Sequence, residues 1–234
     1  MPLEEVVPGL YAILFSDWQV YIYYLVDRDE VTIIDTGGKG SAPRIVEGLR
    51  ELGKGAGDVT RILLTHGHQD HAGSASRLAA TTGAPVHVRA GDANHVREGT
   101  HYQRLKPRTL LGRLILLRRP PTSVEATPVA STFEDGDEIS GMRVTHTPGH
   151  SPGHVVFLWP QHGGVLIVGD ALFNLGYLAP APIYVDLQSM LSSVRKISEL
   201  DFEVACFGHG KPIKQGAGER FRKKFGRSGS STGS

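Results

Sequence analysis

Apolar and polar positions alternate along the chain in short blocks, and most of the apolar blocks have the length and composition of β-strands. They are rich in Val, Ile and aromatic residues and are separated by turn-forming residues. Strands are predicted at residues 10–15, 20–26, 31–35, 62–64 and 86–88, and again at 142–146, 155–159, 165–168 and 204–207. The two groups predict two β-rich halves that pack face to face.

Three segments between these strands have the residue spacing of helices. Ser41 can cap a helix that ends near Gly53. A second helix, rich in small residues, is expected from about Asp70 to Gly83, and a third over residues 187–200. Helices in this order are expected on the outer faces of the two halves.

The composition is that of an ordinary globular protein. The chain has 234 residues, of which 40% are hydrophobic and 21% charged, and this length suits one domain, which we place at residues 1–215. The net charge of +1 predicts no obligate acidic partner. The single cysteine, Cys206, excludes an intramolecular disulfide, and neither a secretory pattern nor a membrane span is visible, so we expect a cytoplasmic protein.

The charge is unevenly distributed along the chain. Residues 89–119 hold eight basic residues against two acidic ones, which makes this insertion between the two halves strongly basic. The same segment has an apolar core at residues 110–117, which makes it amphipathic if helical. Three interpretations are open: a solvated helix that covers the core, a lid beside a binding cleft, and a contact with a membrane or nucleic acid.

Residues 216–234 are predicted to form a flexible tail. Its first part is basic, and residues 226–234 are almost entirely Gly, Ser and Thr, a composition that buries too little apolar area to become ordered. Only Phe221 and Phe225 interrupt the basic run with aromatic rings, and no nucleic-acid-binding motif accompanies it. We therefore expect no nucleic acid as a partner.

One short loop is the strongest indication of chemistry. Directly after the apolar run 62–64, it contains His66, His68, Asp70 and His71. His66 and His68 are two residues apart, so in an extended segment both side chains project to the same side and can hold one cation. Asp70 and His71 begin a helix beyond a turn and can face a second cation close to the first.

Three further candidate ligands follow strand-like runs later in the chain. His150, Asp170 and His209 each stand beside Gly or Pro, where a turn at the end of a strand can direct a side chain into a site. A two-metal site needs about seven protein ligands, and the candidates meet that number. The remaining histidines are expected to be mostly ordinary, although two of them, His95 and His101, could meet a substrate: His87, His95, His101, His146, His154 and His162.

In their order and intervals, the seven candidates resemble the signature of the metallo-β-lactamase superfamily, which runs H-x-H-x-D-H, a later His, a later Asp and a last His. The resemblance extends from about residue 6 to residue 213 and implies an α+β fold, a four-layer αββα sandwich. The ligands that it implies are His66, His68 and His150 for a first metal ion, Asp70, His71 and His209 for a second, and Asp170 as the bridge. It also implies that Asp35 orients the metal loop, whereas a turn-forming Asp is the alternative.

The resemblance implies a metal-dependent hydrolase that acts on a small-molecule substrate. Two zinc ions, with iron or manganese as other options, would hold a bridging hydroxide, and Asp70 and Asp170 would be catalytic as metal ligands. The expected substrate contains an ester, a thioester or a lactone. Residues 169–173 resemble thioesterases of the glyoxalase II type, while lactonases of the family place a tyrosine where this chain has Phe173.

Three alternatives remain beside this function: a mononuclear iron sulfur dioxygenase of the same fold, a β-lactam-hydrolysing enzyme, and a non-enzymatic metal-binding scaffold protein. The resemblance also favours a lid for residues 89–119, because relatives vary their substrate-facing loops between the two halves. Arg104, Lys106, Arg108 and Phe173 are then the candidate substrate contacts. The sequence does not indicate the oligomeric state.

Overall fold

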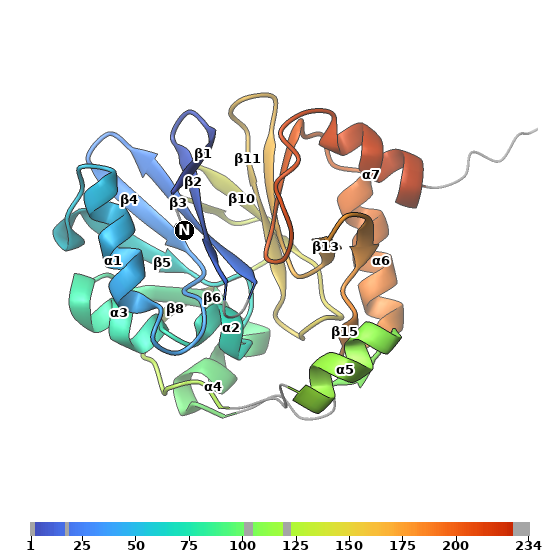
Figure 1. The fold of residues 1–234 in the computed structure, drawn as a ribbon, viewed down its shortest axis with the longest axis horizontal. Helices are drawn as coiled ribbons and strands as arrows, with labels where there is room; N and C mark the ends of the chain where they lie inside the picture. Colours follow the sequence, from blue (N-terminus) through green and yellow to red (C-terminus); the bar gives the residue numbers. More distant parts are fainter. Residues whose placement is uncertain (1–2, 17–18, 101–104, 119–122, 227–234) are drawn as a thin grey trace, which may run out of the picture.

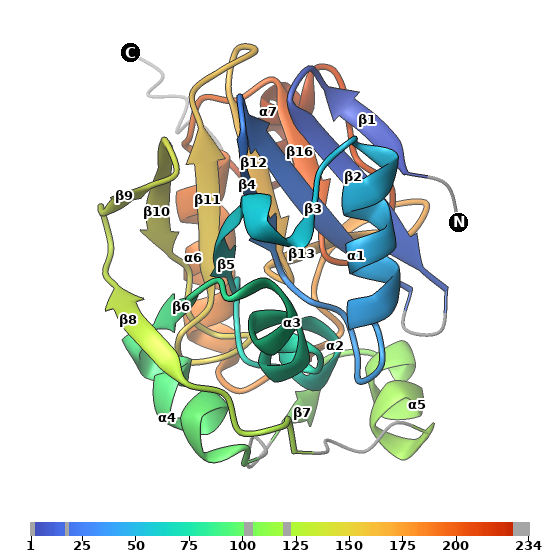
Figure 2. The same ribbon diagram turned by 90° about the vertical axis from the view of Figure 1, so that its left-hand side faces the viewer.

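The computed structural model describes residues 3–16, 19–100, 105–118 and 123–226. Two β-sheets lie face to face at the centre, and helices cover the outer face of each, so the layers follow the order αββα (Figures 1 and 2). This arrangement confirms the predicted α+β four-layer sandwich. Each strand predicted from the sequence is present, with small differences at the ends.

The first sheet has seven strands and comes mainly from the amino-terminal half of the chain. In spatial order the strands are β1 (Glu4–Val7), β2 (Leu10–Phe15), β3 (Val20–Asp27), β4 (Glu30–Ile34), β5 (Val59–Leu63), β6 (Val86–Arg89) and β8 (Val129–Phe133). The first four pair antiparallel, whereas β4, β5, β6 and β8 pair parallel. Because parallel strands end at the same edge, the loops that carry Asp35 and His66 lie side by side.

The second sheet has five strands from the carboxyl-terminal half. In spatial order they are β16 (Val204–Phe207), β12 (Val165–Gly169), β11 (Val155–Trp159), β10 (Met142–His146) and β9 (Glu138–Ile139). Strands β12 and β16 are parallel, and the other neighbours are antiparallel. Asp170 and His209 therefore follow strands that end at one edge, next to the β10–β11 loop that holds His150.

Buried apolar clusters fill the interfaces between the four layers. Successive side chains of a strand point to opposite faces, so neighbours in the sequence enter different clusters. On β3, Ile22 and Tyr24 pack beneath the helices of the first half, while Tyr23 packs between the sheets. On β12, Ile167 enters the same central layer and Leu166 the outer one. Both strands are buried on both faces, which explains why their apolar residues form unbroken runs.

The outer layers and the small sheets complete the fold. On the side of the first sheet lie α1 (Ala42–Glu51), the 3-10 turn η1 (Ala56–Asp58), α2 (Gln69–Ala72), α3 (Ala75–Thr82) and α4 (Ala90–Glu98), and on the side of the second lie α6 (Leu187–Ser198) and α7 (Ala217–Phe225). The remaining elements are α5 (Leu110–Arg118) and two small sheets, which pair β13 (Leu172–Asn174) with β14 (Leu178–Pro180) and β7 (Lys106–Pro107) with β15 (Ile183–Tyr184). Within the described ranges every helix is too short or too polar to span a bilayer.

The second predicted helix is in fact two helices, α2 and α3. Gly73 stands at the break, and a Cβ there would collide with the backbone of residues 38–39. Ser74 Oγ accepts a hydrogen bond from Ser41 N over 2.9 Å and donates one to the Gly38 carbonyl over 2.6 Å. These hydrogen bonds connect the segment that carries the candidate ligands His66 to His71 with the loop before α1. Ser41 precedes α1 as predicted, but its own side chain makes no capping hydrogen bond.

Helix α7 stands where the sequence predicts the beginning of a flexible tail. Its Phe221 is fully buried, and the ring centroids of Phe202 and Phe207 lie 5.0 and 6.2 Å away. The tail prediction is wrong for this stretch because Ala217 and Phe221, four residues apart, share one helix face that a mainly basic sequence conceals. Residues 227–234 lie outside the described part of the chain.

The predicted insertion at residues 89–119 consists of two unlike parts. Helix α4 packs against the first sheet and buries Ala93 and Val96 in its outer core. Beyond residues 101–104, β7 and α5 lie against the other half through the pairing of β7 with β15. The first part therefore belongs to the scaffold. Arg104 and His101 lie outside the described residues.

Candidate metal centre

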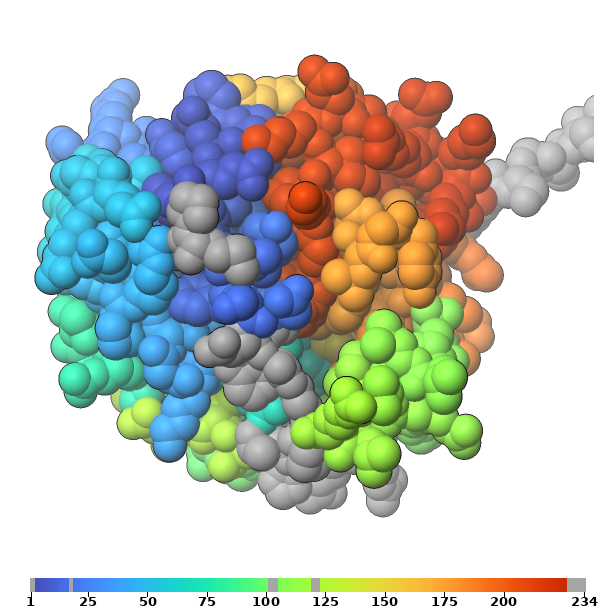
Figure 3. Space-filling view, viewed as in Figure 1, coloured from blue at the N-terminus to red at the C-terminus, as the bar shows by residue number. Residues whose placement is uncertain are grey.

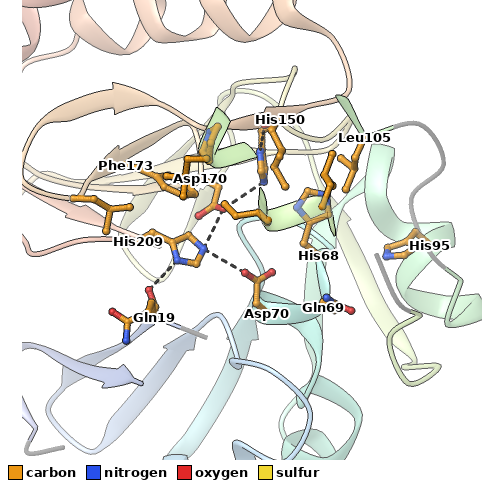
Figure 4. Close-up of a pocket in the computed structure, with 16 residues that line it drawn as sticks. Gln19, His68, Gln69, Asp70, His95, Leu105, His150, Asp170, Phe173 and His209 are labelled. Atoms are coloured by element: carbon orange, nitrogen blue, oxygen red, sulfur yellow. Dashed lines mark hydrogen bonds and ion pairs between the residues drawn. The ribbon is translucent and has the colours of Figure 1, made fainter. Parts of the chain in front are cut away.

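Side chains from four segments meet at the edge where strands of both sheets end (Figure 4). After β5, a loop supplies His66 and His68, and α2 supplies Asp70 and His71. The segments after β10, β12 and β16 supply His150, Asp170 and His209. Three groups of these residues are close enough to share a metal ion, because within each group the ligand atoms lie within 4.8 Å of one another. The groups are His66, His68 and His150; His66, His71 and Asp170; and Asp70, His71 and His209. The structure thus brings all seven candidates together, and two groups coincide with the sets that the resemblance implies.

Asp170 lies between those two sets. Its Oδ1 is 3.3 Å from His71 Nε2, and its Oδ2 is 3.4 Å from both His150 Nε2 and His209 Nε2. His209 Nε2 is also 3.3 Å from Asp70 Oδ2. One carboxylate in contact with ligands of both sets has the geometry that a bridging ligand needs.

Backbone carbonyls orient two of the imidazole rings. His150 Nδ1 donates a hydrogen bond to the Ile183 carbonyl over 3.0 Å, and His209 Nδ1 donates one to the Gln19 carbonyl over 2.8 Å. Because a carbonyl only accepts, Nδ1 carries a proton in both rings, which leaves Nε2 as the nitrogen that a metal ion can bind.

Asp35 connects the loop after β4 to the metal loop. It is buried in a left-handed backbone conformation with φ of 64°. Its Oδ1 accepts a hydrogen bond from Thr65 N over 2.8 Å, and its Oδ2 accepts from Thr65 Oγ1 and from His71 Nδ1, each over 2.8 Å. The carboxylate therefore directs His71 Nε2 towards Asp170, which is the geometry of the orienting role rather than of a simple turn former.

The two sets of ligands differ in charge. Burial lowers the pKa of His66, His68 and His150, which keeps these rings neutral and able to donate a lone pair. Around the second set burial is outweighed by ion pairing: Asp170 raises the pKa of His209 to about 10, and His209 in turn holds the pKa of Asp170 well below its usual range. A metal cation can replace the protons shared there, because both compete for the same atoms.

The buried polar atoms fit a pair of metal ions. Among the described residues, His71 Nε2, His150 Nε2 and Asp170 Oδ1 are buried without a hydrogen-bond partner, which is costly unless a cation lies between them. Gly208 leaves room for two of these side chains, since a Cβ there would collide with Asp170 Oδ1 and come within 2.7 Å of His71 Cε1. Imidazole and carboxylate donors suit zinc best and admit iron or manganese.

Asp92 is a buried residue near the centre that the sequence pattern did not identify as a candidate. At the start of α4, its carboxylate accepts hydrogen bonds from Gly67 N over 3.1 Å and from Ser151 Oγ and Gly153 N, each over 2.7 Å. It thereby joins the loop of the first two histidines to the loop of the third, although these loops come from different sheets. The sequence feature that could have identified Asp92 is its position as an acidic residue within the basic segment 89–119.

His154 also positions the centre, although the sequence suggests an ordinary histidine. Its Nε2 accepts a hydrogen bond from Asp170 N over 3.0 Å, and its Nδ1 donates one to Thr147 Oγ1 over 2.8 Å. Burial lowers the pKa of His154, so the ring stays neutral and Nε2 can accept. Its only sequence signal was its place at the end of the Pro- and Gly-rich loop of His150.

A cavity of about 370 Å³ opens onto the metal centre (Figure 4). Five of the candidate ligands form its floor: His68, Asp70, His150, Asp170 and His209. Its walls are largely apolar and come from Leu111, Ile115 and Leu116 of α5 and from Phe173, Leu175 and Ile183 of the segment after β12. The centre is therefore reached through an apolar chamber.

The candidate substrate contacts fall in different places. Phe173 lines the cavity. Arg108 instead holds the beginning of α5 in place, because its Nε and Nη2 donate to the carbonyls of residues 180–181 over 3.1 and 2.8 Å. Lys106 is exposed on β7, and Arg104 is not described.

Comparisons with known proteins agree with this fold and centre. Residues 16–209 match the family model described as the metallo-beta-lactamase superfamily. The chain is 27% identical to the probable metallo-hydrolase YflN of Bacillus subtilis (strain 168), with 93% of this chain and 89% of that protein covered. It is 30% identical to a hydroxyacylglutathione hydrolase of Cereibacter sphaeroides (strain ATCC 17023), with 89% and 67% covered. The crystal structure of the metallo-beta-lactamase family protein TTHA1429 from Thermus thermophilus is similar with a TM-score of 0.69 and 28% identity, over 94% of this chain and 79% of that one. As its sequence resemblance implied, the chain belongs to the metallo-β-lactamase superfamily of metal-dependent hydrolases.

Proposed function

We propose that the protein uses two zinc ions to hydrolyse an ester, thioester or lactone whose non-reacting part is apolar. The observation that carries this proposal is the cavity, which has metal-ligating side chains as its floor and aliphatic and aromatic side chains as its walls. Such a chamber suits a substrate in which a scissile carbonyl group is joined to an acyl or alkyl portion.

The side chains divide metal binding from substrate binding. The two sets of candidate ligands would hold the two ions, and Asp170, which contacts residues of both sets, would be shared by them. When bound, the metal pair supplies a water of lowered pKa and polarises the substrate carbonyl. Leu111, Ile115 and Phe173 receive the apolar portion, whose burial contributes roughly 25 cal/mol per Å². The relative named hydroxyacylglutathione hydrolase favours the thioester among the three bonds.

Metal content is the first test. Elemental analysis is expected to give about two zinc ions per chain, because seven ligands exceed the number that a mononuclear site uses. A reproducible content near one that added zinc does not raise would contradict the dinuclear centre. Iron together with oxygen-dependent consumption of a persulfide would favour the sulfur dioxygenase.

A substrate panel is the second test. We expect the zinc-loaded protein to turn over at least one ester, thioester or lactone that carries an apolar chain, and to prefer it to the acetyl homologue. Turnover of β-lactams alone would replace the proposed substrate class. Absence of turnover on the whole panel by fully metal-loaded protein would favour a metal-binding scaffold.

A further inference from the structure

Exposed hydrophobic side chains gather at one place on the surface. Among the described residues, the large hydrophobic side chains that stay exposed number six, and they belong either to α5 or to the β13–β14 turn. They are Leu110, Leu111, Leu114, Leu117, Leu175 and Tyr177, which we name the α5 patch. A shallow groove lined by Leu111, Leu175 and Tyr177 joins the helix to the turn, and Figure 3 shows the two segments next to each other on one face.

Helix α5 has apolar side chains on the side that faces the protein and also on the side that faces solvent. Its Gly112 packs so closely on the Pro182 carbonyl that a Cβ would collide with it, and Ile115 lines the cavity. On the outside, Leu110 and Leu117 are 81% and 80% exposed. These two leucines are seven residues apart and therefore share one face of the helix. Leucines left in solvent on the side away from the protein indicate a second apolar environment for this helix.

The patch is also cationic. Residues 105–118 contain Lys106, Arg108, Arg113 and Arg118 and no acidic residue, and residues 171–185 contain no charged residue. All four basic side chains belong to exposed residues, and Lys224 of α7 extends the positive charge, with Nζ 6.0 Å from the centre of the Tyr177 ring. Two copies of this surface facing each other would bring like charges together, which is unfavourable. The charge therefore favours an anionic partner.

We propose that the α5 patch docks on an anionic phospholipid surface. Leucines in the plane of the interface enter the acyl boundary, while arginine and lysine side chains reach the headgroups. Leu111 and Leu175 belong both to the patch and to the cavity wall, so docking places the mouth of the cavity at the lipid surface. An apolar substrate then enters the chamber from the lipid phase without crossing water.

Sedimentation with lipid vesicles tests this proposal independently of any enzymatic activity. The metal-loaded protein is mixed with vesicles of phosphatidylcholine alone and of phosphatidylcholine with phosphatidylglycerol. We expect at least about tenfold tighter binding to the anionic vesicles, which weakens as salt is added. The L110S/L117S variant, altered only at outward-facing leucines, and the R113S/R118S variant should each lose most of that binding.

The matched control is R143S/R195S, which removes two exposed arginines outside the patch and should bind vesicles like the wild type. Metal content and melting temperature show that each variant is folded. Wild-type protein that stays in solution with both vesicles would overturn the proposal, and so would an L110S/L117S variant that binds as well as the wild type. A wild-type dimer that this variant dissociates would assign the patch to a second copy instead.

Discussion

The floor and the outer wall of the cavity are built in opposite ways. The floor is buried, and Asp35, Asp92 and His154 tie its loops together across both sheets. The wall formed by α5 is attached by a two-residue strand pairing and by the Arg108 hydrogen bonds, and its outer leucines face solvent. The loops that carry the candidate ligands are thus held by buried hydrogen bonds from neighbouring segments of both sheets, whereas the substrate-facing helix is held by few contacts.

This difference suggests that the floor of the cavity serves the reaction and the wall serves the choice of substrate. A metal centre needs ligands fixed to within a fraction of an ångström, which buried hydrogen bonds to neighbouring loops provide. A wall with few contacts opens at low free-energy cost and tolerates sequence change without disturbing the core. Changes in the floor should therefore abolish the reaction for every substrate, and changes in the wall should discriminate between substrates.

Removing a ligand should have the largest effect. Asp170→Ala and His68→Ala are each expected to lose metal and to lower kcat/KM by at least about a hundredfold, because the water and the carbonyl are no longer activated. The fold should persist, since both residues lie in loops at strand ends. Asp29→Ala, which removes an exposed carboxylate, serves as the control. Retention of more than about a tenth of the activity by either ligand variant would show that the metal mechanism is wrong.

Asp92→Ala should be the next most damaging change. Three buried donors lose their acceptor, so we expect the protein to lose about 2–4 kcal/mol of unfolding free energy and to bind zinc about 10- to 100-fold more weakly. Denaturant unfolding and zinc titration against a chelator measure the two effects. Asp92→Asn, which keeps one carbonyl acceptor, should fall between the wild type and the alanine variant. Unchanged zinc affinity in the alanine variant would remove Asp92 from the positioning of the centre.

Ile115→Trp should alter selectivity while leaving the metal centre intact. The larger ring fills part of the cavity, so kcat/KM for a long-chain substrate should fall about tenfold and that for its acetyl homologue less than about twofold. Leu114→Trp on the same helix is the matched control, because Leu114 is exposed on α5. Equal losses on both substrates in the Ile115 variant would mean that α5 does not contact the apolar portion.

The smallest effect is expected from Lys106→Ser. The exposed charge of Lys106 should raise the rate of capture of an anionic substrate only at low ionic strength. In the variant, kcat/KM for that substrate should therefore fall about twofold at low salt and be unchanged at high salt. A neutral substrate of the same series should not respond. Arg108→Ser should instead affect both substrates, because this side chain anchors α5. An identical salt response of both substrates in all variants would show that the charge of Lys106 does not contribute to substrate selectivity.

Much of the scaffold and the choice of candidate ligands were predictable from local sequence. Unbroken apolar runs mark strands buried on both faces, and β10, β11 and β16 match their predicted bounds. Four candidate ligands follow one strand within six positions, so their proximity requires no knowledge of the fold. Helix α7 was missed because its buried face, centred on Phe221, lies in a basic and glycine-rich sequence whose average predicts disorder.

The contacts between distant segments were decided by the tertiary structure alone. Asp92 accepts hydrogen bonds from residues 25, 59 and 61 positions away, and His154 accepts one from the backbone of a residue 16 positions away. No local pattern encodes such pairs, because they depend on how the two sheets stack. The same holds for α5: its leucines and arginines are visible in the sequence, but only the fold divides them between a cavity wall, an anchor and an exposed face. The sequence gives the chemical type of each residue directly. The burial of a side chain and its contacts with distant residues are set only when the chain has packed.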